Sequence, residues 1–215
     1  MEGEFAYLVD DLDTDQIAPA NMMRSLTPDY ERGLFGNRRK SALEKGDPLG
    51  FDLPQYVNAP ILVTGKNFGC GSAREVAVWA LCARGIRCII SPSFAPVFRE
   101  SCLKNGLLPV ELLTDCHASL AQVCLADAGR NEFTVDIRAR TLTCPDGTHF
   151  SFAFNDEERD CLMHGIDDVA STMRYSDDIA AWEKRCARLT PWLQQDMFAN
   201  ISDDDHCLTP ITRAN

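Results

Sequence analysis

The sequence has no apolar run near the roughly 20 residues of a membrane span, and its acidic N-terminus lacks a signal-peptide pattern. Basic residues are in the minority, because 21 Lys and Arg stand against 32 Asp and Glu, a formal net charge of −11. Such a charge disfavours nucleic acid and anionic membranes as partners. We therefore expect a cytoplasmic protein that binds neither nucleic acid nor membrane.

Closely spaced cysteine pairs are also absent, although the chain has ten cysteines. Zinc and iron–sulfur sites usually contain such pairs, and no C-x-x-C occurs here. Several thiols, among them Cys82, Cys88 and Cys102, lie inside apolar patterns, where cysteine behaves as a small buried hydrophobe. The sequence predicts reduced, structural thiols and no metal or cofactor bound by this chain.

The length of 215 residues and the hydrophobic content of 45% are those of one ordinary globular domain. Residues 191–215 are polar, with three consecutive aspartates. We therefore expect a single domain over residues 1–190 and a loosely ordered tail over residues 191–215.

Apolar patterning predicts an α/β fold with a second, β-rich layer. Buried strands separated by helices of about ten residues are typical of parallel β–α–β units, whereas period-two alternation is typical of a β-meander. The expected strands are 5–9, 61–64, 86–91, 107–113, 133–137, 140–143 and 149–152, and the expected helices are 72–84, 95–104, 157–164 and 176–189. Gly165 is expected as the C-cap of the third helix and Ser176 as the N-cap of the fourth. In the first helix Val76, Trp79, Ala80 and Ala83 are expected to face the sheet.

The loop at residues 65–75, G-K-N-F-G-C-G-S-A-R-E, is the most informative segment. Ser72 and Glu75 have the spacing of a capping box, so a helix is expected to begin at Ser72. Free N–H groups, a hydroxyl and the Arg74 guanidinium would then suit a small carboxylate or phosphate. The structural alternative is that Ser72 only caps and Arg74 is only solvated. The loop matches neither a P-loop nor G-x-G-x-x-G, so a nucleotide site is poorly supported.

Five ordered motifs closely resemble the small subunits of 3-isopropylmalate dehydratases, leucine-pathway relatives of the mobile C-terminal domain of aconitase. The resemblance covers about residues 5–185. The motifs are D-T-D-Q-I-A-P at 13–19, N-F-G-C-G-S-A-R-E at 67–75, P-S-F-A at 92–95, K-N-G-L-L-P at 104–109 and G-I-D-D at 165–168. The resemblance implies a swivelling β/β/α domain that works with a large subunit, which holds a four-iron four-sulfur cluster.

It also implies a hydro-lyase acting on a small hydroxy-dicarboxylate, with Ser72 as the base in its alkoxide form. Arg74 would clamp a substrate carboxylate, and the backbone from Gly71 to Ala73 would donate N–H groups. Arg24, in the segment that resembles the specificity loop, would meet a further carboxylate, with Met22 and Met23 near an alkyl group. Asp13 and Asp15 are expected to organise a turn.

Two positions depart from the family pattern, because Ala73 stands where serine is usual and Val76 where histidine is usual. Related hydro-lyases that act on citraconate, methylated malates or homoaconitate therefore stay open as alternatives. A non-catalytic anion-binding module of the same fold also stays open, although such a module would have no need of Ser72 as a base.

Overall fold

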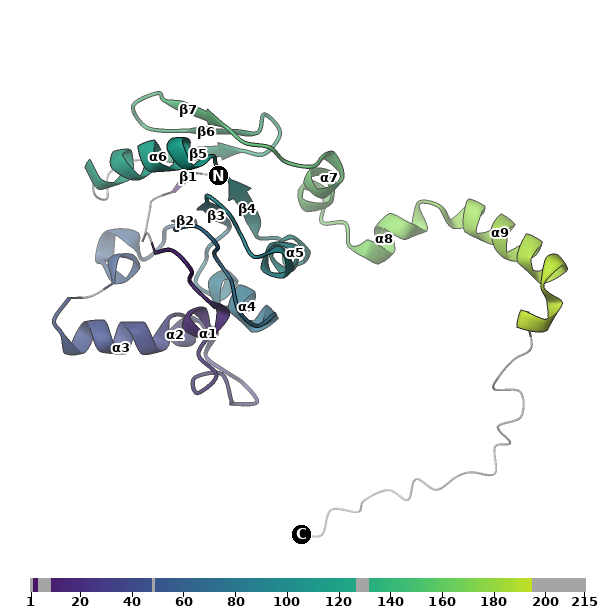
Figure 1. The fold of residues 1–215 in the computed structure, drawn as a ribbon, viewed down its shortest axis with the longest axis horizontal. Helices are drawn as coiled ribbons and strands as arrows, with labels where there is room; N and C mark the ends of the chain where they lie inside the picture. Colours follow the sequence, from purple (N-terminus) through teal and green to yellow (C-terminus); the bar gives the residue numbers. More distant parts are fainter. Residues whose placement is uncertain (1, 4–8, 48, 127–131, 195–215) are drawn as a thin grey trace, which may run out of the picture. The chain divides into compact units, whose positions relative to one another are not determined.

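The computed structural model describes residues 2–3, 9–47, 49–126 and 132–194 (Figure 1). Its internal contacts divide the chain into two compact units, Met1–Asp167 and Asp168–Asn215. Most of the predicted tail lies outside the described residues, so the domain boundary at residue 190 stays a prediction. Within the described ranges no helix is both long enough and apolar enough to cross a membrane.

The first unit is built on a parallel sheet in the order β2-β3-β4, with β2 at Ile61–Val63, β3 at Cys88–Ser91 and β4 at Leu108–Glu111. Helix α4 (Glu75–Ala83) connects β2 to β3, and helix α5 (Pro96–Lys104) connects β3 to β4. Nearly every residue of these strands is buried, since both faces of the sheet are covered. The predicted parallel β–α–β core is confirmed.

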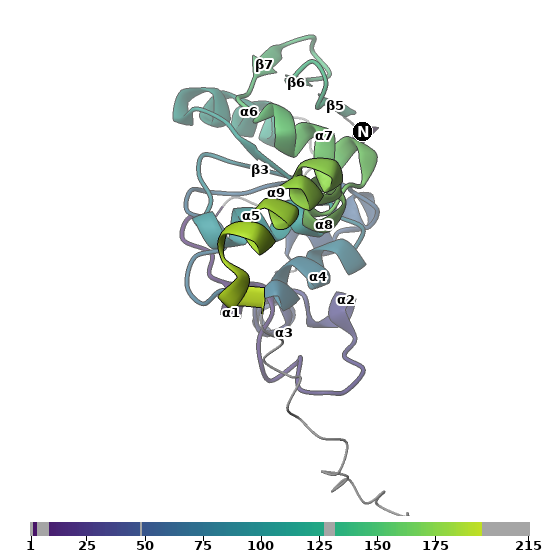
Figure 2. The ribbon, with the colours of Figure 1, turned by 90° about the vertical axis from the view of Figure 1, so that its right-hand side faces the viewer.

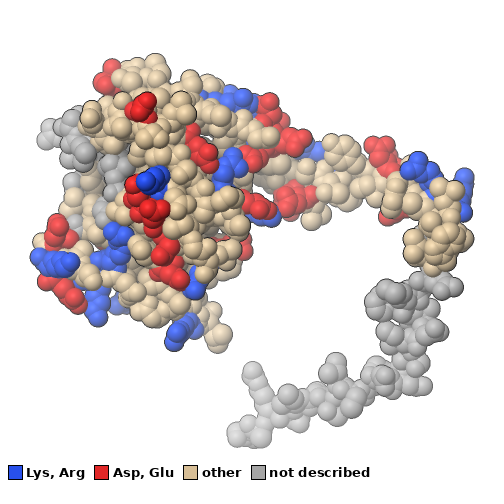
Figure 3. Space-filling model, in the orientation of Figure 1, with Lys and Arg blue, Asp and Glu red and all other residues tan. Residues whose placement is uncertain are grey.

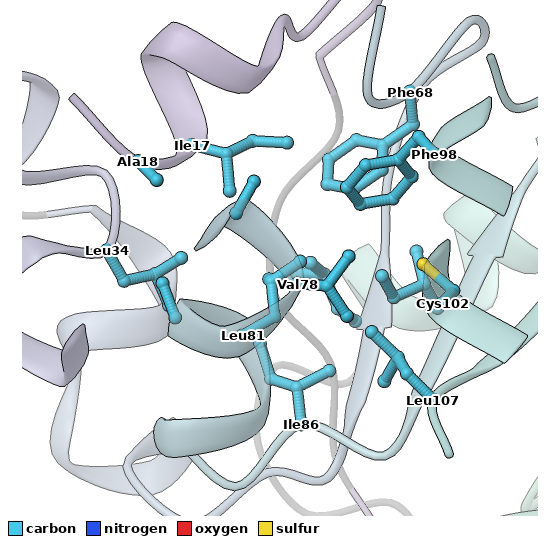
Figure 4. Packing of buried hydrophobic residues seen from close by; sticks show 14 of the residues in the cluster. Ile17, Ala18, Leu34, Phe68, Val78, Leu81, Ile86, Phe98, Cys102 and Leu107 are labelled. Carbon is cyan, nitrogen blue, oxygen red and sulfur yellow. The ribbon is translucent and has the colours of Figure 1, made fainter. Parts of the chain in front are cut away.

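Alternate residues of the strands enter two separate apolar clusters, as the two-residue period of a strand requires. Leu62 and Ile89 pack with α4, α5 and the N-terminal segment, where Val78, Leu81 and Phe98 meet (Figure 4). Ile61, Val63 and Ile90 point the other way, toward helix α6 (Thr114–Ala126) and the meander. Figures 1 and 2 show the resulting layers, with α4 and α5 on one side of the parallel sheet and α6 on the other.

The meander is an antiparallel sheet in the order β1-β5-β6-β7, with strands Glu2–Gly3, Phe133–Asp136, Thr141–Thr143 and His149–Ser151. Phe133, Val135, Leu142 and Phe150 are buried and alternate with more exposed residues. The predicted meander and fold class are confirmed, while most of the expected strand 5–9 lies outside the described residues.

Several helices were not predicted from the sequence, namely α6 and the N-terminal helices α1 (Thr14–Ile17), α2 (Tyr30–Gly33) and α3 (Gly36–Glu44). Two short 3-10 turns, η1 (Gly50–Asp52) and η2 (Pro54–Tyr56), follow them. The N-terminal helices are short or polar, and α3 buries only Gly36, so they carry almost no apolar periodicity.

The buried face of α4 differs from the predicted one. Ala77, Val78, Ala80 and Leu81 are buried, whereas Trp79 is 41% exposed. The indole N–H of Trp79 donates to Oδ1 of Asn105 at 3.0 Å. An indole that reaches a polar partner at the surface leaves the core to the smaller aliphatic residues, and the helix rotates accordingly.

Helix α7 (Asp156–His164) ends the first unit, with Asn155 as N-cap and Gly165 in the left-handed conformation at its end, as predicted for Gly165. A bidentate pair from Arg99 to Glu158, at 2.9 and 2.7 Å, ties α7 to α5. On the face of the first unit in Figure 3, acidic and basic side chains are interspersed.

The second unit consists of α8 (Asp168–Met173), α9 (Ser176–Leu189) and the 3-10 turn η3 (Pro191–Gln194). The bounds of α9 match the predicted ones, but Tyr175 is its N-cap and makes no side-chain capping bond, so the predicted cap at Ser176 is wrong. Neither α8 nor α9 buries a residue.

Candidate active site

The loop at residues 65–75 is joined along its length to the segment at residues 10–15. Three backbone bonds connect the two segments: Asp11 N to Lys66 O (2.9 Å), Gly69 N to Leu12 O (2.8 Å) and Thr14 N to Cys70 O (3.0 Å). Two of the five sequence motifs therefore lie together, although the residues that these bonds join are more than fifty positions apart along the chain.

The motif at residues 92–95 supports the other side of this loop. The Asn67 N–H donates to Oγ of Ser93 at 2.8 Å, and the Phe68 N–H donates to the Ser93 carbonyl at 3.1 Å. Phe68 is fully buried and makes edge contacts with the rings of Phe94 and Phe98. At Gly69, with φ +76°, a Cβ would come within 2.1 Å of the Phe98 ring, so only glycine fits beneath this packing.

Helix α4 begins at Glu75, three residues later than the sequence predicts, and the predicted capping box is wrong. Arg74 occupies the N-cap position and makes no side-chain capping bond. The Glu75 carboxylate instead accepts from Nδ2 of Asn105 at 2.9 Å. A partner thirty residues away has thus replaced the local capping partner. Ser72 stands outside the helix and caps nothing.

Ser72 lies in an exposed bend between Gly71 and Ala73, which are also exposed. The backbone is fixed there by Thr14, a buried residue whose hydroxyl donates to the Ser72 carbonyl at 2.6 Å. Gly71 has φ +84°, which a side chain would strain. The N–H groups of Gly71, Ser72 and Ala73 bond to no residue in the described ranges, so they are free to meet an anion.

Arg74 forms an ion pair with Asp15, in which Nη1 lies 2.8 Å from Oδ1. Asp13 caps α1, since its carboxylate accepts from the Gln16 N–H at 2.7 Å, which confirms the turn role predicted for Asp13. The same prediction missed Asp15, whose carboxylate instead meets Arg74. Both members of the pair are partly exposed, at 35% and 54% of their side chains, so water screens their attraction.

The residues of the expected specificity segment are less clearly part of this site. Arg24 is exposed and pairs with no acidic residue in the described ranges. Met23 packs on the core against Gly33, as a gap-filling methionine does. Met22 lines a surface hollow of about 560 Å³ together with charged side chains of α2 and α3. Val76, where histidine is usual in the family, packs against the core cluster.

The described thiols do not fit a metal or iron–sulfur site of this chain. No group of three or more His, Cys, Asp or Glu side chains comes together within the described ranges. Burial raises the pKa of Cys124 to about 12 and that of Cys144 to about 11, so both stay protonated at neutral pH. Cys70 is partly exposed in the candidate loop, and burial together with Asp13 raises its pKa as well. Metal ligation requires the thiolate, which these environments disfavour.

Comparison with known proteins agrees with this arrangement. The family model of the aconitase C-terminal domain matches residues 43–115, and that of the C-terminal domain of 3-isopropylmalate dehydratase small subunits matches residues 168–196. A 3-isopropylmalate dehydratase small subunit of Rhodospirillum centenum is 40% identical over 190 residues, covering 84% of this chain and 90% of the relative. A protein of the same name from Brucella anthropi is 40% identical over 187 residues, with the same coverage of both chains.

A solved structure supports the fold. The crystal structure of a 3-isopropylmalate dehydratase from Methanocaldococcus jannaschii matches with a TM-score of 0.59 at 23% identity, covering 84% of this chain and 98% of that one. The resemblance of the five motifs is therefore confirmed by matches that extend over most of the sequence. This chain belongs to the family of 3-isopropylmalate dehydratase small subunits.

Proposed function

We propose that this chain is the small subunit of a two-subunit 3-isopropylmalate dehydratase. The enzyme would interconvert 2-isopropylmalate and 3-isopropylmalate by dehydration and rehydration, a step of leucine biosynthesis that fits the cytoplasmic location expected from the sequence. The names of its relatives support this assignment. The observation that carries the chemistry is that Ser72 is exposed and does not cap α4. It lies two residues before Arg74, on a loop that the motifs at residues 13–19 and 92–95 hold in place.

Ser72 is proposed as the base that removes the proton next to a substrate carboxylate. A serine hydroxyl is a poor base unless its alkoxide is strongly stabilised, and three features favour the alkoxide here. The backbone N–H groups of residues 71–73 bond to no described residue, the N-terminus of α4 begins just beyond, and the Arg74 cation is two residues from Ser72. The Thr14 hydroxyl holds the Ser72 carbonyl, and the Ser72 residue itself is exposed.

Arg74 is proposed as the carboxylate clamp. Its guanidinium already holds one carboxylate, that of Asp15, at hydrogen-bond distance. A substrate carboxylate would exchange with Asp15 or join it on the guanidinium fork, which has five donors. The exchange costs little, because Asp15 is half exposed and water solvates its released carboxylate. Gly71 and Ala73 would contribute N–H groups, and Arg24 would contact a further carboxylate of the substrate.

The partner in this proposal is a large subunit that holds the four-iron four-sulfur cluster, since the described thiols of this chain do not fit one. The leaving hydroxide needs a Lewis acid, which that partner would supply. Ser72 and its neighbours are also exposed in this chain, whereas an alkoxide and an ion clamp work best where water is excluded. A covering partner would provide that exclusion.

The test is turnover of this chain, mixed with its large subunit, on a panel of hydroxy acids. We expect dehydration of 3-isopropylmalate by the mixture and none by either protein alone. The isolated chain, purified without oxygen, should be colourless, and iron–sulfur absorbance in it would overturn the two-subunit division.

Methylated malates are included for dehydration, and the unsaturated acids citraconate and homoaconitate for hydration, because Ala73 removes a hydroxyl that the family usually has. Preference for one of these would move the assignment to a related hydro-lyase. Binding of hydroxy acids with no turnover of any would indicate an anion-binding module.

A further inference from the structure

Helix α9 of the second unit has an apolar stripe along one side. Its members are spaced four, three, four and three residues apart, so they lie within one narrow face of the helix. They are Tyr175, Ile179, Trp182, Cys186 and Leu189. Asp177, Lys184 and Arg188 occupy the opposite face at the same helical period. A helix with this division of faces is built to lie against an apolar surface.

Within the described residues of the second unit, nothing covers the stripe. Tyr175 is 62% exposed, Trp182 58% and Leu189 67%, and α9 buries no residue at all. Two aromatic rings and a leucine aligned along one face are unlike the single exposed hydrophobes that every protein surface has. The α9 stripe is therefore expected to have an occupant.

We propose that the α9 stripe docks into an apolar groove of the large subunit, the partner assigned under the proposed function on which this inference rests. The segment from residue 168 to 196 matches a family model of its own, described as the C-terminal domain of the small subunit. The helix that carries the stripe is thus a characteristic part of these small subunits. Helix α9 would accordingly serve the assembly of the two-subunit enzyme.

A second copy of this chain fits the stripe less well. Helix α9 has 14 residues and is about 21 Å long. An aromatic side chain has a full surface area of about 150–250 Å². The exposed parts of the stripe residues therefore add up to an apolar area of roughly 500 Å². A stable pair of proteins needs about 800 Å² from each partner. If the first unit binds the large subunit as the proposed function states, the stripe adds a second contact to the same partner, and the short connection between the two units makes that contact effectively intramolecular.

The first unit of the same chain offers no apolar seat within its described residues. Its exposed large hydrophobes are spread over separate loops and helices: Leu26, Leu43, Val57, Trp79, Val97 and Leu113. The 560 Å³ hollow is lined mainly by charged groups, among them Asp29, Arg32 and Lys40.

The test compares two charge-altering variants of the full chain in binding to the purified large subunit. Ile179→Lys with Trp182→Glu places charges on the stripe, and Lys184→Glu with Arg188→Glu alters charge on the opposite face. We expect the stripe variant to raise the Kd by about tenfold or more, as loss of a buried aromatic anchor does. The control should stay within about twofold. With the partner at saturation, both variants should keep the wild-type kcat, because the stripe carries no site residue.

Trp182→Ala gives a milder second variant, and circular dichroism checks that α9 remains helical in each. An unchanged Kd for helical stripe variants would overturn the proposal. So would concentration-dependent dimers of the isolated chain that the stripe variant abolishes, or a loss of stability of the isolated chain in that variant. Normal complex formation with no turnover of any hydroxy acid would instead reject the proposed function and leave the docking result standing.

Discussion

At the scale of single residues, Arg74 and Asp15 form the contact with the clearest chemical consequence. The guanidinium is held by one contact, in which Nη1 lies 2.8 Å from a carboxylate oxygen of the protein. In the isolated chain the arginine is therefore oriented and its charge is compensated before substrate arrives. In the proposed mechanism a substrate carboxylate would replace Asp15 on the guanidinium, and hydration of the released Asp15 carboxylate would offset part of the cost of desolvating the substrate.

Replacement of Arg74 by lysine should weaken catalysis for every hydroxy acid that the reconstituted enzyme accepts. Lysine keeps the charge but cannot present two parallel N–H donors to one carboxylate. Loss of one charge-assisted bond costs about 1.5–3 kcal/mol, or roughly tenfold to more than a hundredfold in kcat/KM. Steady-state kinetics of the Arg74→Lys complex measures this loss.

Arg138→Lys is the matched control, because Arg138 is exposed in the meander, away from the loop. Unchanged kinetics of the Arg74→Lys enzyme would remove the carboxylate clamp from the proposal. Changes at Arg24, by contrast, should alter the ranking among substrates.

The residue pattern identified Ser72 and Arg74 but misassigned their local structure. S-x-x-E is a good capping signal in isolation, yet the Glu75 carboxylate bonds to Asn105, and Asp15 engages Arg74. Both partners come from other parts of the chain, so no local rule could find them. Asp15 and Thr14 were present in a recognised motif, but only the three-dimensional pairing of the two segments shows what they contact.

At the scale of elements, bonds to the segment at residues 10–15 hold the shape of the loop at residues 65–75 more than the loop's own sequence does. The link nearest the proposed base is the bond from the Thr14 hydroxyl to the Ser72 carbonyl at 2.6 Å. Thr14→Val keeps the side-chain shape and removes this bond. We expect a loss of about 1 kcal/mol in the free energy of unfolding. A fall of about tenfold to a hundredfold in kcat should accompany it, because the serine is no longer held in place.

Thr64→Val is the matched control for this substitution. Thr64 is as deeply buried as Thr14, but its hydroxyl bonds to no residue in the described ranges. Removing an unpartnered buried hydroxyl should leave stability unchanged or raise it. Chemical denaturation and turnover of both variants make the comparison. An equal effect of the two substitutions would mean that the Thr14 bond does not position Ser72.

The strands and the two crossover helices could be predicted to within about three residues at each end, because continuous buried runs alternate there with helical stretches. Helix α6 was missed, although His117, Leu120, Ala121 and Cys124 are buried at helical spacing. The helical periodicity was present, but three of these four residues are a histidine, an alanine and a cysteine. Such residues contribute little to a hydrophobic pattern read from sequence. Helix α3 has too few apolar residues to be found this way.

At the scale of the whole molecule, His117 should make the stability of the chain depend on pH. It is 6% exposed, and its Nε2 bonds to no described residue. Burial lowers the pKa of His117 below its ordinary value, so the unfolded chain binds this proton more readily than the folded one. The contribution of the uncharged His117 to the free energy of unfolding is therefore complete above about pH 6.5. It is lost as the pH falls toward the pKa of His117 in the folded chain.

Denaturation of the isolated chain at pH 7.5 and pH 5.5 measures this effect. His117→Asn removes the titrating ring while keeping an amide donor, so it should flatten the dependence between these two values. An equal slope in wild type and variant would assign the pH dependence to other groups.

Gly71, Ser72 and Ala73 are exposed on the first unit, and in the proposed function a partner completes the active site around them. The proposed function requires that Ser72 serves catalysis and not structure. The structure sharpens this claim, because Ser72 caps no helix and its loss should not carry the cost of about 1 kcal/mol that removal of a cap brings.

The most direct measurement is therefore kcat of the Ser72→Ala chain with its large subunit, together with its free energy of unfolding. We predict that kcat falls by at least about a hundredfold, as loss of a catalytic base does, while unfolding matches that of wild type and of the exposed control Ser151→Ala. Turnover near the wild-type rate in the Ser72→Ala complex would contradict the account.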